Sequence, residues 1–279
     1  MERAFRLAVG QAPAELSSTG DRLDWLRDSL PGVADHGTDL LLLPELFATG
    51  YNIADQIAHR AEPANGKIAQ AIAKMAVDHG VAIHYGFPEA DGDTVFNAAQ
   101  CFGPDGRRLG GHRKLLIPPG FERAHFTQGQ GCTLFTYRNV RIATLICYDA
   151  EFPETVRHVA ALGAQLVLVP TALGAEWDWV SQRMIPTRAY ENGVFLAYAN
   201  SAGTENGMTF LGQSFIAAPG GTELARAGSQ PEIIRGTLEI GKVAAAQARL
   251  PYLEDRNLLA SDIRQGGQAR NPSGASRGS

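Results

Sequence analysis

Residues 38–45 read TDLLLLPE and residues 164–171 read AQLVLVPT. Each stretch is a short apolar run with a proline near its end. A strand that is apolar at successive positions is covered on both faces, which is typical of the strands of an α/β sheet. The recurrence of this pattern is the first indication that the chain contains two similar halves.

The segments around these two strands recur in the same order. Residues 193–203 (GVFLAYANSAG) match residues 80–90 (GVAIHYGFPEA), and residues 215–225 (FIAAPGGTELA) match residues 101–110 (CFGPDGRRLG). Each of the last two segments is a strand, a turn rich in proline and glycine, and a more polar strand. We therefore predict two α/β halves packed sheet against sheet with helices outside, a four-layer α-β-β-α sandwich.

Amphipathic patterns between the strands predict the outer helices. Apolar residues at helical spacing predict a helix over residues 21–37, and Gly80 is expected to end a second helix over residues 66–80. Pro186 lies within a further helical pattern and is expected to divide it.

Composition limits the classes of function. The 279 residues carry a formal net charge of −4, so no basic surface for nucleic acid or anionic membrane is expected. No apolar run approaches the roughly 20 residues of a membrane helix, and three cysteines are too few for a disulfide framework. We expect a cytoplasmic protein with one domain over residues 1–264 and a disordered tail over residues 265–279.

Three strand ends carry side chains suited to catalysis. Glu45 follows LLLLP, Lys114 precedes LLIP, and Cys147 follows RIATLI. Side chains at such edges are expected to meet at one crevice, where a base, a cation and a thiol suit acyl transfer through a thioester. A helix predicted to begin near residue 154 would also favour the Cys147 thiolate. Taken alone, Cys147 is also explained as a buried core residue, and Glu45 as an acid in the first turn of a helix. Cys101 and Cys132 are expected to be structural.

Several motifs in order resemble the nitrilase superfamily of carbon–nitrogen hydrolases over roughly residues 4–260. LLLLPELFATGYN is similar to the glutamate motif of that family, HRKLLIP to its lysine motif, and LICYDAEFPE to its cysteine motif. GFERAHFTQG resembles the segment that carries a second active-site glutamate, which falls on Glu122. Leu115 and Leu116 depart from the family pattern, which often has a histidine there.

This resemblance implies a mechanism without a metal or other cofactor. Glu45 is the implied base, Cys147 the nucleophile, and Lys114 with the backbone N–H of Tyr148 the oxyanion hole. Glu122 is implied to position Lys114 or the substrate nitrogen. The implied partners are a small-molecule amide and a second copy of the chain, as a homodimer or higher homo-oligomer.

Substrate preference is expected to come from the loops around the crevice. Tyr51 stands just beyond Glu45, and the segment after the strand at 164–171 supplies Glu176, Trp177 and Asp178, where an acid and an aromatic wall could bind a distant ammonium. In the alternative interpretation the two acids are first-turn helix residues, and the tryptophans are core or dimer contacts. Arg188 and Glu191 are one turn apart and predict a structural ion pair.

The motif details leave several activities open. The string CYDAEFPE is similar to the amidase version of the cysteine motif, and with LPYLEDR it most resembles aliphatic amidases of ω-amino amides such as 5-aminopentanamide. Hydrolysis of an N-carbamoyl amine is the main alternative, and nitrile hydrolysis or ligand binding without catalysis are lesser ones. A Ser-His-Asp hydrolase is disfavoured because GQSFI lacks the last glycine of G-x-S-x-G.

Overall fold

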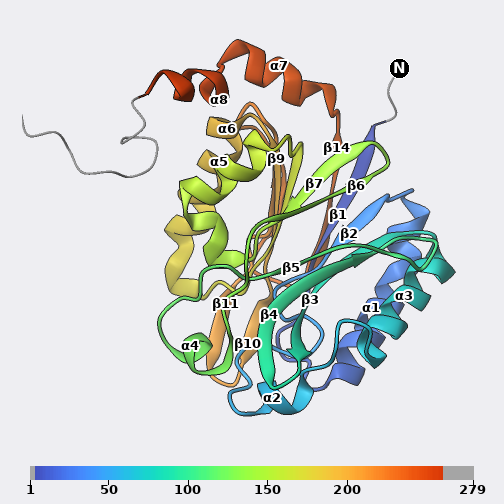
Figure 1. Ribbon diagram of the computed structural model, residues 1–279. Helices are drawn as coiled ribbons and strands as arrows, with labels where there is room; N and C mark the ends of the chain where they lie inside the picture. The colour runs from blue at the N-terminus through green and yellow to red at the C-terminus, as the bar shows by residue number, and fades with distance from the viewer. Residues whose placement is uncertain (1–3, 260–279) are drawn as a thin grey trace, which may run out of the picture.

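A computed structural model describes residues 4–259, which form two six-stranded sheets and a short hairpin (Figure 1). The first sheet has the order β14 (Glu232–Leu238), β1 (Phe5–Gln11), β2 (Leu40–Leu42), β3 (Ala82–Asp91), β4 (Thr94–Phe102), β5 (Arg108–Arg113). The second has the order β13 (Glu223–Arg226), β12 (Phe215–Ala217), β9 (Phe195–Ala199), β8 (Leu166–Pro170), β7 (Val140–Thr144), β6 (Thr133–Tyr137).

The two sheets have the same internal arrangement. In the first, β1, β2 and β3 run parallel, and β4 and β5 continue the sheet antiparallel. In the second, β7, β8 and β9 run parallel, and β12 and β13 continue it antiparallel. The predicted pair of similar α/β halves is therefore confirmed. The last strand, β14, returns to pair with β1 of the first half.

Helices cover the outer face of each sheet and complete the four-layer sandwich (Figure 1). Helices α1 (Thr19–Asp35) and α3 (Lys67–His79) lie on the first sheet, and α5 (Pro153–Ala161) and α6 (Ile185–Asn192) lie on the second. Gly80 ends α3 in the left-handed conformation, as predicted. Pro186 stands in the first turn of α6, directly after the π-helix η3 (Val180–Met184). The predicted division into two pieces is not seen, because the backbone stays helical at Met184 and Ile185 and only the type of helix changes there.

The remaining elements are short. They are α2 (Gln56–Arg60), α4 (Phe121–His125), η1 (Cys147–Glu151), η2 (Ala175–Trp177), β10 (Ala202–Glu205), β11 (Met208–Leu211), α7 (Gly241–Arg249), α8 (Tyr252–Asp255) and η4 (Arg256–Leu258). The hairpin of β10 and β11 has no counterpart among the sequence predictions. It brings residues 202–211 beside the loop that follows β2.

The apolar strands contribute to two cores at once because successive side chains of a strand point to opposite faces. Leu40 and Leu42 pack between the two sheets, whereas Leu41 and Leu43 pack against α1 and α3. Burying each such side chain stabilises the fold by about 1.5–3 kcal/mol. This two-sided burial explains the uninterrupted apolar run that precedes Glu45.

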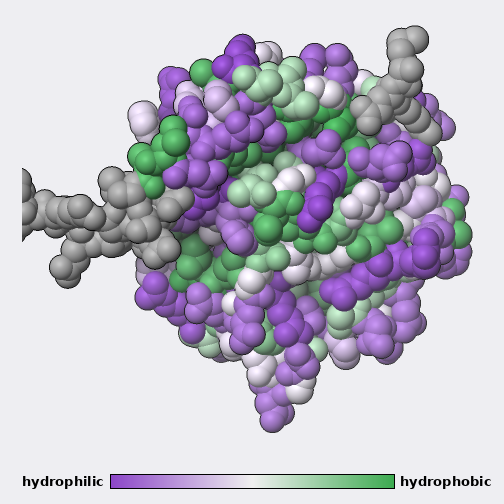
Figure 2. Space-filling view, turned by 45° about the horizontal axis from the view of Figure 1, so that its top comes forward, coloured by the Kyte–Doolittle hydropathy of each residue, from purple (hydrophilic) through white to green (hydrophobic). Residues whose placement is uncertain are grey.

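The outer surface mixes residue types. The face in Figure 2 carries hydrophobic residues in small groups among hydrophilic ones. Within residues 4–259 no helix combines the length and the apolar character that crossing a membrane requires. The tail predicted over residues 265–279, and the end of the domain predicted at residue 264, lie outside the described residues.

Candidate active site

Glu45 stands where the chain leaves the buried strand β2. The next residue, Leu46, has a φ of +50°, so the backbone turns sharply just after the glutamate. Gly86 of β3 faces this turn, and a Cβ atom at that position would lie 2.4 Å from the Leu46 backbone nitrogen. Only glycine leaves room for this close approach of two backbones, which places the carboxylate of Glu45 inside the molecule.

Two carboxylates and one ammonium group meet at this point. Lys114 Nζ lies 2.7 Å from Glu45 Oε1 and 2.8 Å from both carboxylate oxygens of Glu122. The side chains of Lys114 and Glu45 are fully buried, and Glu122 is almost so. Burial alone would lower the pKa of Lys114, but the facing charges of Glu45 and Glu122 outweigh it and raise the pKa. Lys114 therefore remains a cation at physiological pH.

The two oxygens of Glu45 have different surroundings. Oε1 accepts hydrogen bonds from Lys114 Nζ and, at 2.6 Å, from Asn97 Nδ2. Oε2 is buried and has no hydrogen-bond partner among the described residues. Burial raises the pKa of Glu45, Lys114 lowers it and Glu122 raises it, and the result is a pKa of about 7. Glu45 thus has one free oxygen and can gain or lose a proton near neutral pH.

Cys147 begins the short helix η1 in a strained conformation. Its φ is +46°, a region that residues with a Cβ rarely adopt and that is often found at functional sites. The Thr171 side chain interacts with the Cys147 thiol and lowers its pKa, and its hydroxyl donates to the Tyr198 hydroxyl at 3.0 Å. The Thr171 carbonyl accepts the Glu45 N–H at 3.4 Å. The residue that follows β8 thus connects the base with the thiol.

The expectation that a helix dipole would favour the Cys147 thiolate is wrong. Burial, followed by the facing charge of Glu45, raises the pKa of Cys147 well above its ordinary value, and Lys114 offsets this only in part. The helix that begins at Pro153 is separated from Cys147 by η1, so its dipole acts at a distance. Cys147 is therefore a thiol at rest and needs a base.

Two tyrosines stand next to this cluster, since Tyr148 follows Cys147 and Tyr51 contacts Glu122. Tyr148 is the second residue of η1, so its N–H is one of the first-turn amides that a helix leaves without an internal partner. The Tyr51 hydroxyl donates to Glu122 Oε1 at 2.7 Å. Burial raises the pKa of Tyr51 well above its ordinary value, so it remains a neutral donor. Tyr51, predicted to line the crevice, thus also holds a partner of the lysine.

Asp149 ties the lysine segment to the cysteine segment. Its Oδ1 accepts the backbone N–H groups of Leu115 and Leu116 at 3.0 and 2.8 Å, and its Oδ2 accepts that of Ile146 at 3.0 Å. His112 Nε2 lies 3.0 Å from the same Oδ2, and both side chains are fully buried. The Asp149 carboxylate therefore sets the distance between the segments that carry Lys114 and Cys147.

The other predicted substrate-contacting residues lie apart from this cluster. Glu176 and Trp177 belong to η2 and are exposed, as is Asp178 after it. In the described part of the chain they make no hydrogen bond or ion pair with Glu45, Lys114 or Glu122. Arg188 and Glu191 form an ion pair at 3.1 Å, as predicted from their spacing.

Sequence reasoning missed three residues of the site. Asn97, Thr171 and Asp149 hold the base, the thiol and the two backbone segments, respectively. A signal was present for Asn97 alone, since it is a polar residue inside the apolar strand β4. The contacts of Thr171 and Asp149 follow from how the two sheets face each other, which the sequence pattern does not show.

Comparisons with known proteins agree with this geometry. The profile of the carbon–nitrogen hydrolase family matches residues 6–248. A protein of Pseudomonas protegens, named hydrolase in pqqF 5'region, is 38% identical, with 91% of this chain and 90% of that protein covered. An (R)-stereoselective amidase of a Pseudomonas species is 34% identical, with 85% of each chain covered.

A comparison with solved structures also finds an amidase. The chain is similar to a mutant of the Nesterenkonia AN1 amidase from the nitrilase superfamily, with a TM-score of 0.81 and 33% identity. The match covers 93% of this chain and 98% of that one. The chain therefore belongs to the carbon–nitrogen hydrolase family, and amidases of the nitrilase superfamily are its relatives in both sequence and structure.

Proposed function

We propose that this carbon–nitrogen hydrolase is an amidase that converts a small aliphatic carboxamide to the acid and ammonia through a cysteine thioester. The observation that carries the proposal is the buried Glu45–Lys114–Glu122 cluster beside the strained Cys147. A buried cluster of charges costs desolvation energy, and a reaction that develops negative charge next to a thiol explains why it is kept.

The first half of the reaction forms the thioester. Glu45 Oε2 accepts the Cys147 proton while the sulfur attacks the amide carbonyl, because the raised pKa of the thiol makes prior ionisation unfavourable. The carbonyl oxygen becomes an oxyanion, which the Lys114 ammonium and the Tyr148 N–H stabilise. Glu45 then returns the proton to the leaving nitrogen, the carbon–nitrogen bond breaks, and ammonia departs.

The second half releases the acid. Glu45 takes a proton from a water molecule as the water oxygen attacks the thioester carbonyl, and the same two donors hold the second oxyanion. The carbon–sulfur bond breaks, the thiolate regains the proton from Glu45, and the enzyme returns to its initial state. A pKa of about 7 suits Glu45 for both directions of this transfer.

The enclosure of the site supports a small acyl group. Cys147 is 7% exposed and Glu45 2%. Mutants of the Nesterenkonia amidase form complexes with butyramide and acrylamide, and another carries the acetamide moiety of fluoroacetamide at its active-site cysteine. We extend this class of short amides to the present chain. An ω-amino amide would reach outward, toward the exposed acids Glu176 and Asp178.

Ammonia release from a panel of compounds tests the proposal. The panel contains acetamide, butyramide, 5-aminopentanamide, an N-carbamoyl amine and a nitrile of matched length. We expect turnover of the amides, with little or none of the other two. Preference for 5-aminopentanamide over an amide of equal length without the amine would support the ω-amino class. Turnover of the N-carbamoyl amine or the nitrile in place of the amides would contradict the proposed function.

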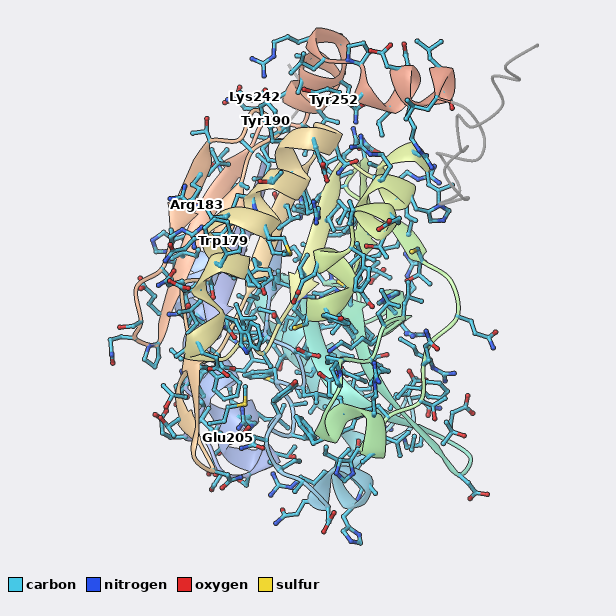
Figure 3. The ribbon with its side chains drawn as sticks, turned by 90° about the vertical axis from the view of Figure 1, so that its left-hand side faces the viewer. Trp179, Arg183, Tyr190, Glu205, Lys242 and Tyr252 are labelled. Atoms are coloured by element: carbon cyan, nitrogen blue, oxygen red, sulfur yellow. The ribbon has the colours of Figure 1, made fainter. Side chains whose placement is uncertain are left out.

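We also propose that a second copy of the chain binds the face formed by α5, α6 and the segment between β8 and α6. Trp179, Tyr190 and Tyr252 lie on the side that Figure 3 shows, and Trp179 is 66% exposed. Large aromatic residues are enriched in protein interfaces, and exposing them on a monomer is unfavourable. The resemblance to the nitrilase superfamily, which implies a homodimer or higher homo-oligomer, supports a second copy as the occupant.

The molar mass in solution tests the dimer. We expect twice the chain mass by light scattering at micromolar concentration, and the mass of one chain for the variant Trp179→Glu with Tyr190→Glu. Val77→Glu on α3 is the control, because Val77 is exposed on the opposite outer layer and its replacement is expected to leave the dimer intact. A wild-type protein with the mass of one chain would contradict this proposal.

A further inference from the structure

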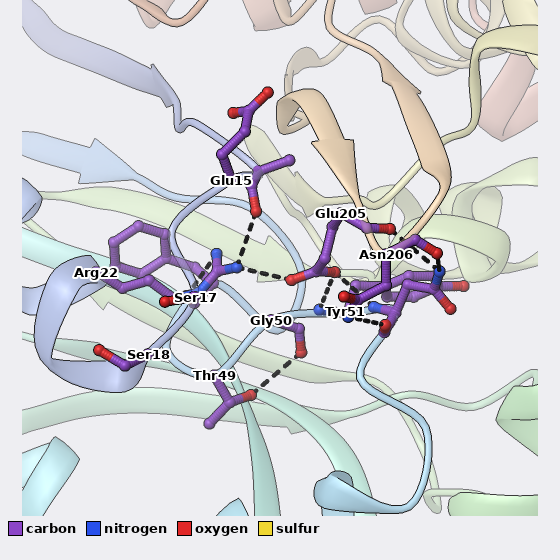
Figure 4. Close-up of polar contacts among 12 residues, drawn as sticks. Glu15, Ser17, Ser18, Arg22, Thr49, Gly50, Tyr51, Glu205 and Asn206 are labelled. Atoms are coloured by element: carbon purple, nitrogen blue, oxygen red, sulfur yellow. Dashed lines mark hydrogen bonds and ion pairs between the residues drawn. The ribbon is translucent and has the colours of Figure 1, made fainter.

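A buried ion pair lies outside the catalytic cluster, between two distant parts of the chain. Arg22 of α1 and Glu205 at the end of β10 meet with 2.7 Å between Arg22 Nη2 and Glu205 Oε1 (Figure 4). Their side chains are 3% and 8% exposed. Removing two charges from water is costly, so such a pair is weak evidence for stability and raises the question of what it holds in place.

Both members of the pair bind the loop that carries the catalytic base. Glu205 Oε2 accepts the backbone N–H groups of Tyr51 and Asn52 at 2.9 and 2.6 Å. Arg22 Nη1 donates to the carbonyl of Phe47 at 3.4 Å. The segment that begins with the base is therefore held at two points, at Phe47 and at residues 51–52.

The turn is shaped to accept the carboxylate. Gly50 has a φ of +99°, and a Cβ atom at this position would lie 2.4 Å from Glu205 Oε1. A residue with a side chain would push the carboxylate away from the turn or distort the turn itself. The close contact between Gly50 and Glu205 thus directs the next two amides toward one carboxylate oxygen.

Tyr51 continues from this turn into the catalytic cluster. Its ring packs edge-on against Phe121, with ring centroids 5.0 Å apart, and against Phe210 of β11 at 6.1 Å. Its hydroxyl donates to Glu122, which in turn holds the Lys114 ammonium. The backbone of Tyr51 thus binds the ion pair, and its hydroxyl binds the partner of the oxyanion-stabilising lysine.

We propose that Arg22 and Glu205 are positioning residues for catalysis, which hold the turn at residues 50–52 so that the Tyr51 hydroxyl orients Glu122 and, through it, Lys114. The inference rests on the proposed function of the site. Neither residue touches the reacting atoms. The hairpin of β10 and β11 therefore belongs to the catalytic apparatus although it contributes no catalytic group.

Removing both charges together tests the role of the pair, because a single replacement leaves an unpaired buried charge. In the variant Arg22→Met with Glu205→Leu, kcat for the best amide of the panel is expected to fall by about 10- to 100-fold, the range for one lost hydrogen bond to a charged group. Arg22→Met with Glu205→Gln keeps an acceptor for the Tyr51 and Asn52 amides and is expected to restore part of kcat, because only the contacts of Arg22 are then missing. Melting temperature and circular dichroism are measured on each variant.

A double-mutant cycle with Tyr51→Phe separates positioning from general destabilisation. In the Tyr51→Phe background, loss of the ion pair is expected to lower kcat less than about threefold, because the hydrogen bond from residue 51 to Glu122 is already absent. If loss of the ion pair lowers kcat by the same factor with and without the Tyr51 hydroxyl, the inference is overturned. It is also overturned if the variant Arg22→Met with Glu205→Leu folds and keeps the wild-type kcat. If that variant does not fold, Glu205→Asp decides: it keeps the charge but withdraws the carboxylate, and unchanged kcat would overturn the inference. A wild-type protein inactive on all amides would instead refute the proposed function.

Discussion

Cys147→Ala is expected to lower kcat for amide hydrolysis by about 10⁴-fold or more, the scale seen when the nucleophile of a covalent mechanism is removed. Without the sulfur no thioester forms, and the Glu45–Lys114–Glu122 cluster can only bind the substrate. The fold is expected to survive, because Cys147 makes few core contacts and alanine adopts the same strained φ no less readily. Ammonia release and the melting temperature are the measurements.

The other two cysteines provide matched controls. Cys101 is buried between the sheets and Cys132 is half-buried, and neither hydrogen-bonds the catalytic cluster. Cys132→Ala is expected to keep wild-type kcat, and Cys101→Ala is expected to change stability more than kcat. Activity that persists in Cys147→Ala would show that Cys147 is not the nucleophile, and its loss in either control variant would point to that thiol instead.

Glu45→Gln is expected to reduce kcat by about 10²- to 10⁴-fold, the usual contribution of a general acid–base group. Glutamine fills the same space and keeps an acceptor for Lys114 and Asn97, so binding of a short amide is expected to change much less than kcat. The measurement is the separation of kcat from KM for the same amide. An unchanged kcat would show that Glu45 is not the base.

The pH dependence of the wild-type enzyme reports the same group. Burial raises the pKa of Glu45 to about 7, and only the ionised form can accept the Cys147 proton. We therefore expect kcat/KM to fall about tenfold per unit as the pH drops below about 7. The charge of Glu122 is among the causes that raise this pKa, so Glu122→Gln is expected to shift the fall of kcat/KM to lower pH. A profile that is flat between pH 5 and 8 would contradict the assignment.

Much of the fold follows from local patterns in the sequence. Strands such as β2 and β8, apolar on both faces, predicted sheets covered on both sides, and the repeated order of segments predicted two halves. Gly80 marked the end of a helix because its effect on the backbone is intrinsic to the residue. The hairpin of β10 and β11 carried no such signal. Its strands have only four residues each.

The proposed catalytic residues Glu45, Lys114 and Cys147 were visible as polar groups at the ends of apolar strands, but their electrostatics were not. Placing Cys147 ahead of a helix led to the expectation of a stabilised thiolate. In the folded protein the thiol is buried and faces the charge of Glu45, and burial is the largest cause that raises its pKa. The same burial gives Glu45 a pKa near neutrality. Desolvation depends on all surrounding atoms, and these come from both halves.

The sequence by itself determined the four-layer sandwich and the family, and it placed Glu45, Lys114 and Cys147 at strand ends and Glu122 in a motif that resembles the family, because strand pattern and motif are local properties of the chain. Only the tertiary structure decided which oxygen of Glu45 is free, that the cysteine rests as a thiol, and that the Arg22–Glu205 pair holds the Tyr51 turn. These properties depend on distances between residues up to 183 positions apart, which only packing of the two halves creates.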